Sequence, residues 1–331
     1  MTDGVQLGLV GVGWWGGVLA NAAKESGRAE VVTCFSRSPE GRESFAREHR
    51  CKAAPSMEAL LEDAVVDGVL VATPHTTHAD LVERVAEAGK HVFVEKPLTL
   101  TVADARRAIR ACDRAGVILQ VGHNARRHPA IRRIKQLVEA EELGVVLQLE
   151  GNRSGPAAHL PTLAPWRADP AESPAGGMAA MGTHIVDTFN FLVGPARRVS
   201  AFSANVLDVR AIDDATTVLI EYESGPLGYL GTSYFVPVTN MICMYGTDGA
   251  AWSEQDATRL FIQKRADSTR IEQAVETLDT VADEIGEFAL CIQEGGAPET
   301  GGPEGVEVAA VMEAIVRSAE TGCAVELSDL R

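Results

Sequence analysis

A glycine-rich segment near the start of the chain constrains its fold more than any other feature. Gly11-Val12-Gly13-Trp14-Trp15-Gly16 directly follows an apolar run at Gln6–Val10 and begins a helical pattern. In such a turn the first glycine permits the sharp bend, the second lets a pyrophosphate approach the backbone, and the third lets the helix pack on the strand. The helix N-terminus adds unpaired N–H groups and the positive end of a dipole. The segment therefore predicts a dinucleotide site, and the alternative is a purely structural turn.

The candidate cofactor contacts in this segment are Gly11, Gly13, Trp14, Trp15 and Gly16. We expect at least one of the two tryptophans to pack in the core instead.

Short apolar runs alternate with helical patterns over the first third of the chain. The runs are Gln6–Val10, Val31–Phe35, Gly68–Ala72, His91–Glu95 and Ile118–Val121. They are nearly all apolar rather than alternating, which is typical of strands covered on both faces. Strand–helix alternation with right-handed crossovers favours a doubly wound parallel sheet. We therefore predict an α/β dinucleotide-binding domain over residues 1–122.

The pattern changes after Gly122. We expect a helix over 129–140, a strand over 145–151, a long surface loop over 154–177 and a helix over 178–192. Strand-like runs then follow one another at 199–206, 216–223, 227–236 and 240–245, and two helices close the chain. Strands in succession favour an antiparallel sheet. Residues 123–331 are therefore predicted to form an α+β domain that binds substrate.

Composition argues against several classes of partner. Acidic residues outnumber basic residues by 46 to 30, and the formal net charge is −16. A field of this sign repels nucleic-acid phosphates and anionic membranes. No stretch reaches the roughly 18 consecutive apolar residues of a membrane helix, and the N-terminus lacks a signal-peptide pattern. We expect a cytoplasmic protein that acts on a small molecule.

Cysteine and histidine patterns predict neither disulfides nor a metal site. The six cysteines form no C-x-x-C pair and are interpreted as reduced, small apolar side chains. His75, His78 and His123 are too scattered to form a tight ligand cluster.

The choice between NAD and NADP depends on the end of the second strand. A carboxylate about 20 residues beyond the glycines would bind the ribose hydroxyls of NAD. This chain has Ser36-Arg37-Ser38 there. Arg37 and the hydroxyls can hold a 2′-phosphate through charge-assisted hydrogen bonds. Ser36 and Arg37 therefore predict a preference for NADP; the alternative is that Arg37 only stacks on adenine and both cofactors work.

Further motifs carry a family resemblance along essentially the whole chain. Glu95-Lys96-Pro97 lies at the end of the apolar run His91–Glu95, and Ala72-Thr73-Pro74 with His78 follows the run before it. Gly122-His123-Asn124 and Gly176-Gly177 through Gly182-Thr183-His184 follow. Together with the glycine turn, these segments resemble the Gfo/Idh/MocA family of oxidoreductases. The resemblance implies a Rossmann domain followed by an open, mainly antiparallel sheet that forms the homo-oligomer contact. It also implies cofactor contacts at Thr73, Pro74, His78, Glu95 and Lys96.

The resemblance further implies two catalytic residues. Lys96 would approach the reacting oxygen beside the nicotinamide, and a base for the hydroxyl proton is what hydride removal from an alcohol requires. His184 would relay a proton or bind substrate, and Asp187 lies within reach on the same helix face. Many family members have an aspartate four residues before this histidine, where this chain has Ala180. An aspartate-assisted proton relay is therefore not expected here.

Candidate substrate contacts besides Lys96 and His184 are Asn124, Arg126, Arg127, Arg153, His159 and Arg167. Two converging arginines would favour an anionic substrate, because a guanidinium fork suits planar oxyanions. We expect hydride transfer between nicotinamide and a secondary alcohol or ketone of a sugar, cyclitol or polyol. One alternative is a dehydrogenase of a carboxylated cyclic dihydrodiol. The other is a non-catalytic NAD(P) sensor or co-regulator.

Overall fold

The computed structural model describes residues 4–156 and 164–331, and the chain forms two compact units. The first unit comprises Met1–Thr99, Ala103–His123 and Asp279–Val306. The second comprises Leu100–Val102, Asn124–Leu278 and Glu307–Arg331. The main division falls one residue from the predicted boundary, but the return of Asp279–Val306 to the first unit differs from the prediction. The segment belongs to the first unit because the helix that it contains packs in the core of that unit.

The first unit contains a parallel sheet of six strands. They are β1 (Val5–Val10), β2 (Ala29–Phe35), β3 (Lys52–Ala53), β4 (Gly68–Val71), β5 (His91–Val94) and β6 (Leu119–Val121). Their order is β3-β2-β1-β4-β5-β6, so the chain reverses its direction of travel between β1 and β4. This is the switch point beside which open α/β sheets bind ligands, outside the carboxyl ends of the strands. The parallel sheet is confirmed; the two-residue β3 was too short to predict.

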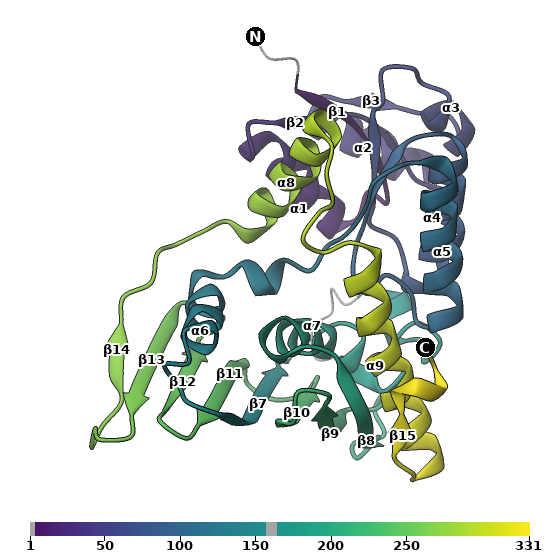
Figure 1. The fold of residues 1–331 in the computed structure, drawn as a ribbon. Helices are drawn as coiled ribbons and strands as arrows, with labels where there is room; N and C mark the ends of the chain where they lie inside the picture. Colours follow the sequence, from purple (N-terminus) through teal and green to yellow (C-terminus); the bar gives the residue numbers. More distant parts are fainter. Residues whose placement is uncertain (1–3, 157–163) are drawn as a thin grey trace. The chain divides into compact units, whose positions relative to one another are not determined.

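Helices cover both faces of this sheet (Figure 1). They are α1 (Trp14–Glu25), α2 (Pro39–His49), α3 (Met57–Leu61), α4 (His78–Glu87), α5 (Val102–Ala115) and α8 (Thr280–Glu294). Ile285, Phe288 and Ala289 of α8 share one buried cluster with residues of β1, β2 and α1. This shared core explains why a helix so late in the sequence belongs to the first unit.

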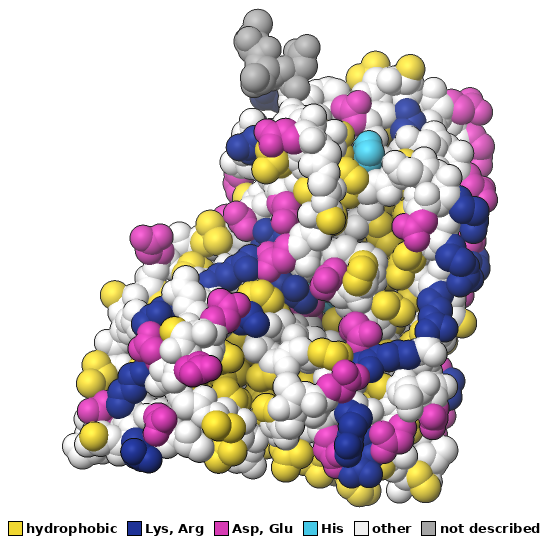
Figure 2. Space-filling view, viewed as in Figure 1, with side chains coloured by type: hydrophobic (Ala, Val, Ile, Leu, Met, Phe, Trp, Pro, Cys, Tyr) yellow, Lys and Arg dark blue, Asp and Glu magenta, His cyan; other side chains and the backbone are white. Residues whose placement is uncertain are grey.

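Helices α4 and α5 lie side by side and are joined by ion pairs. Arg107 on α5 contacts Asp80 at 2.8 Å and Glu83 at 2.6 Å, both on α4. Figure 2 shows a row of basic side chains along α5, while acidic and basic groups intermingle elsewhere on the visible face. The paired part of this row is therefore a solvated helix face rather than a polyanion-binding surface.

The second unit is built on a nine-stranded sheet. Its strands are β7 (Val146–Ser154), β8 (Ala196–Ala204), β9 (Ala215–Tyr222), β10 (Leu227–Ser233), β11 (Thr239–Gly246), β12 (Gly249–Glu254), β13 (Arg259–Lys264), β14 (Ile271–Gln273) and β15 (Val325–Glu326). The order is β14-β13-β12-β11-β7-β10-β9-β8-β15, and only the β7–β10 pair is parallel. The predicted mainly antiparallel sheet is confirmed, with β12 to β15 added to the strands expected from the sequence.

One face of this sheet carries α6 (Pro129–Glu139) and α7 (Gly182–Val193), while α9 (Gly302–Thr321) lies near β8 and β15 (Figure 1). Gly151 on β7 lets α7 approach, because a Cβ there would lie 2.4 Å from Ile185 Cγ2. The helix expected over 178–192 begins at Gly182, after a 3₁₀ turn at Gly176–Met178. The loop expected over 154–177 is not all at the surface, since Glu172 and Ser173 are buried.

Candidate functional site

The three glycines of the N-terminal turn have three different steric surroundings. Gly11 has φ +103°, and a Cβ there would lie 2.2 Å from the Ala72 carbonyl oxygen. At Gly16 a Cβ would lie 2.2 Å from the Gly11 oxygen, so this glycine allows α1 to pack on the strand. At Gly13 no atom of the described chain lies within 4 Å of a Cβ. The backbone is therefore open to a ligand at the middle glycine only, as a pyrophosphate requires.

The start of α1 is free to receive an anion. Gly13 is the N-cap residue and provides no side-chain cap, and the first turn contains no acidic residue. Unpaired N–H groups and the helix dipole therefore favour phosphate there. Trp14 is 80% exposed, whereas Trp15 packs against the core cluster of the unit. Trp14 is thus the tryptophan that remains accessible to a cofactor.

The end of β2 presents a basic and polar segment. Arg37 is exposed, and no ion-pair partner is found for it within the described residues. The Ser36 hydroxyl donates to the Ser38 carbonyl at 3.1 Å, and Ser38 caps α2 by accepting from the Gly41 N–H. Arg42 donates to the Ser36 carbonyl at 3.1 Å. The local hydrogen bonds hold the loop while the Arg37 guanidinium stays at the surface.

The loops after β4 and β5 are tied together by His78. Its ring nitrogens lie 2.9 Å from the Pro97 carbonyl oxygen and 3.0 Å from that of Thr73. The side chain is fully buried. Both ring nitrogens face backbone oxygens of the protein, and the expected contact of His78 with the cofactor stays a prediction. We assign His78 a positioning role: it links the Thr73-Pro74 segment to the segment that carries Lys96.

Lys96 follows β5 at the carboxyl edge of the parallel sheet, the edge at which the glycine turn also lies. The Lys96 backbone N–H donates to the carboxylate of Glu95 at 3.3 Å, and Glu95 is buried. The Lys96–Pro97 peptide bond is cis. A Cβ at Gly122, after β6, would lie 3.0 Å from Glu95 Oε1, so the glycine leaves room for this carboxylate. Glu95 therefore shapes the loop that presents Lys96.

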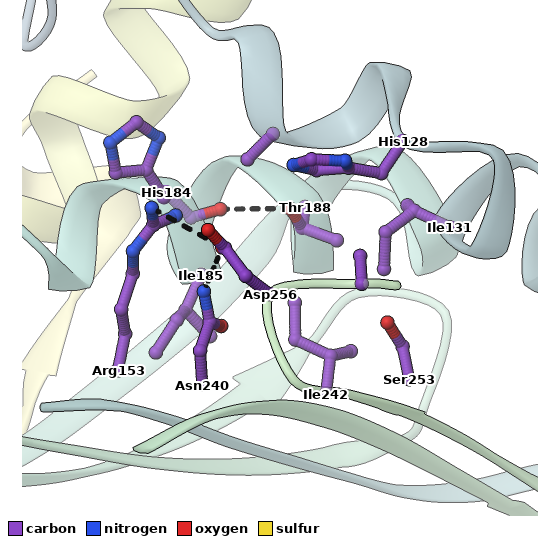
Figure 3. Close-up of a pocket in the computed structure, with 12 residues that line it drawn as sticks. His128, Ile131, Arg153, His184, Ile185, Thr188, Asn240, Ile242, Ser253 and Asp256 are labelled. Carbon is purple, nitrogen blue, oxygen red and sulfur yellow. Dashed lines mark hydrogen bonds and ion pairs between the residues drawn. The ribbon is translucent and has the colours of Figure 1, made fainter. Parts of the chain in front are cut away.

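A pocket in the second unit gathers residues from the helices and from one face of the sheet (Figure 3). It is lined by Ala125, His128, Ile131, Arg153, His184, Ile185, Thr188, Asn240, Ile242, Ser253, Asp256 and Ala257. The pocket volume is about 20 Å³, enough for one water-sized group. Arg153 and His184 are the predicted substrate residues that the structure brings together here.

Strand register explains this convergence. Asn240 on β11 is the direct cross-strand partner of Arg153 on β7, and Ser253 on β12 is the partner of Ile242. Directly paired residues, and residues two apart on one strand, project from the same face of a sheet. Asn240, Ser253, His128 and Asp256 were missed from the sequence, because no local motif records which strands pair.

Opposite charges meet in the pocket. Arg153 lies 3.6 Å from Asp256, which also accepts a hydrogen bond from Asn240 (Figure 3). Burial lowers the pKa of Arg153, and Asp256 opposes this shift. Burial also lowers the pKa of His128, with Asp256 raising and Arg153 further lowering it. The paired charges and a His128 that favours its neutral form give the pocket both donors and acceptors.

His184 lies in the first turn of α7, and its carbonyl accepts from the Thr188 hydroxyl at 2.8 Å (Figure 3). Asp187 on the same helix accepts two hydrogen bonds from Arg126, at 2.9 and 2.5 Å. Both side chains of this ion pair are buried. The guanidinium fork of Arg126 therefore holds a carboxylate of the helix that carries His184. The expected contact of Arg126 with substrate stays a prediction.

The other substrate candidates of the second unit that the structure describes are not among the residues that line this pocket. Asn124 begins the 3₁₀ turn Asn124–Arg127, one residue before Ala125 of the pocket, and Arg127 is buried. Arg167 stacks on the Trp166 ring at 4.4 Å. His159 lies outside the described residues. Ala180, where family members have an aspartate, packs beside an apolar cluster of Ile212 and Tyr234.

The described residues contain neither a metal-binding cluster nor a membrane-spanning helix. No group of three or more His, Cys, Asp or Glu side chains among them is arranged to hold a metal ion. None of their helices combines the length and apolarity needed to cross a membrane.

Both units match known protein families. Residues 5–123 match the model of an oxidoreductase family with an NAD-binding Rossmann fold, and residues 131–252 match the GFO/IDH/MocA C-terminal domain. A D-xylose 1-dehydrogenase (NADP⁺) from Haloferax volcanii is 31% identical over 278 residues, covering 82% of this chain and 84% of the relative. An inositol 2-dehydrogenase from Rhizobium meliloti is 28% identical, with 95% and 96% of the two chains covered.

A solved structure extends this likeness to the whole fold. A protein from Desulfitobacterium hafniense, described as an NADPH-dependent oxidoreductase, has a TM-score of 0.94 at 29% identity and covers 100% of this chain and 99% of its own. The two family models match well over half of this chain. The chain therefore belongs to the GFO/IDH/MocA family of NAD(P)-dependent oxidoreductases.

Proposed function

We propose that this enzyme catalyses the reversible NAD(P)-dependent oxidation of a secondary hydroxyl on a neutral sugar, cyclitol or polyol. The observation that carries the proposal is Lys96, which follows β5 at the edge of the parallel sheet where the open glycine turn also lies. Open α/β sheets bind their ligands at this edge. A relative named for D-xylose and one named for inositol support the substrate class.

Each residue of the site has a distinct role in the proposed reaction. The nicotinamide, when bound, supplies or accepts the hydride. Lys96 takes the hydroxyl proton during oxidation and returns it during reduction, as a general base and acid. His184 binds the substrate or passes the proton onward. Glu95 and His78 hold the Lys96 segment, and Arg126 holds Asp187 on the helix of His184.

NADP is the proposed preferred cofactor. The end of β2 offers the exposed Arg37 and the hydroxyl of Ser36, with no carboxylate in the segment Ser36-Arg37-Ser38. A guanidinium attracts a 2′-phosphate, and no neighbouring acid of this segment repels it. The relative from H. volcanii, whose name includes NADP⁺, is consistent with this preference.

The balance of charge favours a neutral substrate over the carboxylated dihydrodiol. That alternative needed converging arginines to bind a carboxylate. Arg126 and Arg153 are each paired with an aspartate of the protein. Hydroxyl groups can satisfy donors and acceptors together, so they suit the remaining polar surface of the pocket.

We also propose a homo-oligomer formed through the outer face of the nine-stranded sheet. Phe202, Leu219 and Leu227 on this sheet are 74%, 58% and 52% exposed. Large exposed apolar side chains on one face favour association. Light scattering coupled to gel filtration tests this proposal, and a monomer at micromolar concentration would contradict it.

The function is tested by absorbance at 340 nm with NADP and NAD against neutral sugars, cyclitols and polyols. We expect turnover with at least one compound and a loss of about a thousandfold in Lys96→Ala, the usual scale for a general base. Fluorescence titration should show that this variant still binds the cofactor. Lys52→Ala, at an exposed lysine paired with Asp63, is the control. Equal activity of Lys96→Ala and the parent enzyme would overturn the assignment.

A further inference from the structure

The strongest unassigned feature is the carboxylate of Asp256 in the pocket of the second unit. It lies 3.6 Å from Arg153 and accepts a hydrogen bond from Asn240. Arg153 and Asn240 are cross-strand partners on β7 and β11, whereas Asp256 comes from the turn between β12 and β13. A carboxylate from a separate element therefore meets the one arginine of the pocket wall.

The turn that carries Asp256 has an unusual backbone. Gln255, Asp256 and Ala257 all have positive φ angles, at +53°, +57° and +60°. Consecutive L-residues in this region are disfavoured and persist only where surrounding contacts fix them. The contacts of Asp256 with Arg153 and Asn240 provide such a constraint. Inside the turn, the N–H and the hydroxyl of Thr258 both donate to the Gln255 carbonyl. Local hydrogen bonds and the contacts of Asp256 with Arg153 and Asn240 therefore hold the carboxylate at the pocket together.

We propose that Asp256 is a specificity residue that selects hydroxyl-bearing neutral groups and rejects carboxylates in this subsite. A guanidinium only donates hydrogen bonds, and a carboxylate only accepts them. A substrate hydroxyl does both, so it can accept from Arg153 and donate to Asp256 at once. A substrate carboxylate can bind Arg153 only where it also faces the negative charge of Asp256.

The size of the subsite limits what it receives. Its volume of about 20 Å³ fits one water-sized group. The subsite therefore takes one end of a substrate, such as a hydroxymethyl group, rather than a complete sugar ring. His128 and Ser253 in the same wall add hydroxyl-compatible partners. This inference rests on the proposed function only for the identity of the substrate class.

Matched ligand pairs test the proposal by binding alone. D-Glucose and D-glucuronate differ at one end, a hydroxymethyl group against a carboxylate, and xylitol and D-xylonate form a second such pair. Their dissociation constants are measured by NMR titration of the NADP-loaded enzyme and of the Asp256→Asn variant. Glu254→Gln is the control, because Glu254 lies two residues away and pairs with Arg270.

We expect the parent enzyme to bind the neutral member of each pair more tightly. Asp256→Asn should shift the acid-to-neutral affinity ratio toward the acid by about threefold to fivefold, a modest change because the Asp256 side chain is 63% exposed and solvent screens its charge. Glu254→Gln should leave the ratio unchanged. The proposal is overturned by an unchanged ratio in Asp256→Asn, by an equal shift in Glu254→Gln, or by tighter binding of the acids to the parent.

The outcome is separate from that of the proposed function. An enzyme that binds the neutral ligands in an Asp256-dependent way but oxidises no polyol would retain the subsite and lose the proposed reaction. An enzyme that oxidises a polyol and binds no member of either pair would retain the reaction and lose the subsite.

Discussion

The two units build their parts of the site in opposite ways. In the first unit the candidate groups lie directly after strands, on short continuous segments such as Gly11–Gly16 and Glu95–Pro97. The backbone itself has a large part there: it is open to a ligand at Gly13, and its carbonyls contact the ring of His78. In the second unit the pocket is made of side chains from β7, β11, β12 and α7. The first arrangement is local in sequence, and the second depends on which strands pair.

The largest expected effect concerns the buried Arg126–Asp187 ion pair of the second unit. Arg126→Ala leaves the Asp187 carboxylate, which is fully buried, without its two strongest donors. Such a loss costs about 3–5 kcal/mol in the free energy of unfolding. Urea unfolding at pH 7 measures it. Arg126→Met combined with Asp187→Leu should recover most of the loss, because no charge is then left buried.

A loss below about 1 kcal/mol in Arg126→Ala would place the pair among weakly coupled surface contacts. It would also weaken the contrast between a first unit built on backbone and a second unit held by side chains.

The next effect separates the two roles of glycine in the first unit. In Gly16→Ala the Cβ would lie 2.2 Å from the Gly11 oxygen. We expect unfolding free energy to fall by about 2–3 kcal/mol, despite the better helix propensity of alanine. In Gly13→Ala the Cβ meets no described atom within 4 Å. Stability should then change by less than about 0.5 kcal/mol, while the NADP dissociation constant rises by roughly tenfold to a hundredfold.

Thermal unfolding and fluorescence titration of both variants distinguish these outcomes. If Gly13→Ala binds NADP as the parent does, the pyrophosphate does not approach this glycine. If Gly13→Ala loses as much unfolding free energy as Gly16→Ala, the two glycines are equally crowded by the protein.

The same contrast sets how far the sequence predicts the molecule. The parallel sheet follows from local signals, because buried apolar runs and the glycine turn each lie on one continuous segment. The place of α8 could not be predicted, since an amphipathic helix does not record which core receives Ile285 and Phe288. Strand β3, two residues long, carries no periodic pattern at all.

The substrate half was harder for a physical reason. Arg126 and Arg153 have the same chemistry in the sequence, and both were expected to bind substrate. Their carboxylate partners are 61 and 103 residues away, so long-range packing alone decides that each arginine is paired. The backbone partners of His78 were equally out of reach of the sequence: this histidine, which we predict to contact the cofactor, lies against two backbone carbonyls.

A smaller effect is expected at Arg37, where the first unit does use a side chain. Arg37 is exposed, so its charge is partly screened by solvent. Arg37→Ala should weaken NADP binding by about 1 kcal/mol, roughly fivefold, and leave NAD binding unchanged. The ratio of kcat/KM for the two cofactors measures this, with Arg47→Ala on α2 as control. An equal loss for both cofactors would indicate that Arg37 stacks on adenine.

The smallest effect is a titration that compares one histidine in each unit. Burial lowers the pKa of His91, with Asp67 opposing, and the Ile118 N–H donates to its Nδ1 at 3.0 Å. Burial also lowers the pKa of His128, where Asp256 opposes and Arg153 adds to the shift. Each of these two histidines binds a proton near pH 6.5 in the unfolded chain, and only at a lower pH in the folded chain. The stabilisation that each neutral histidine adds to the free energy of unfolding is therefore fully present above about pH 6.5. It is lost as the pH falls through the pKa of the folded state.

NMR titration of the ring protons should give midpoints below 6.5 for both histidines, and a midpoint at or above this usual value of about 6.5 would contradict the burial argument. Asp256→Asn removes the charge that raises the pKa of His128, so that midpoint should move lower. The midpoint of His91 should stay, because its electrostatic partner is Asp67 of the first unit. A change in the His128 midpoint alone would mean that the charges of the subsite act within the second unit. A change in both midpoints would show that the two units are electrostatically coupled.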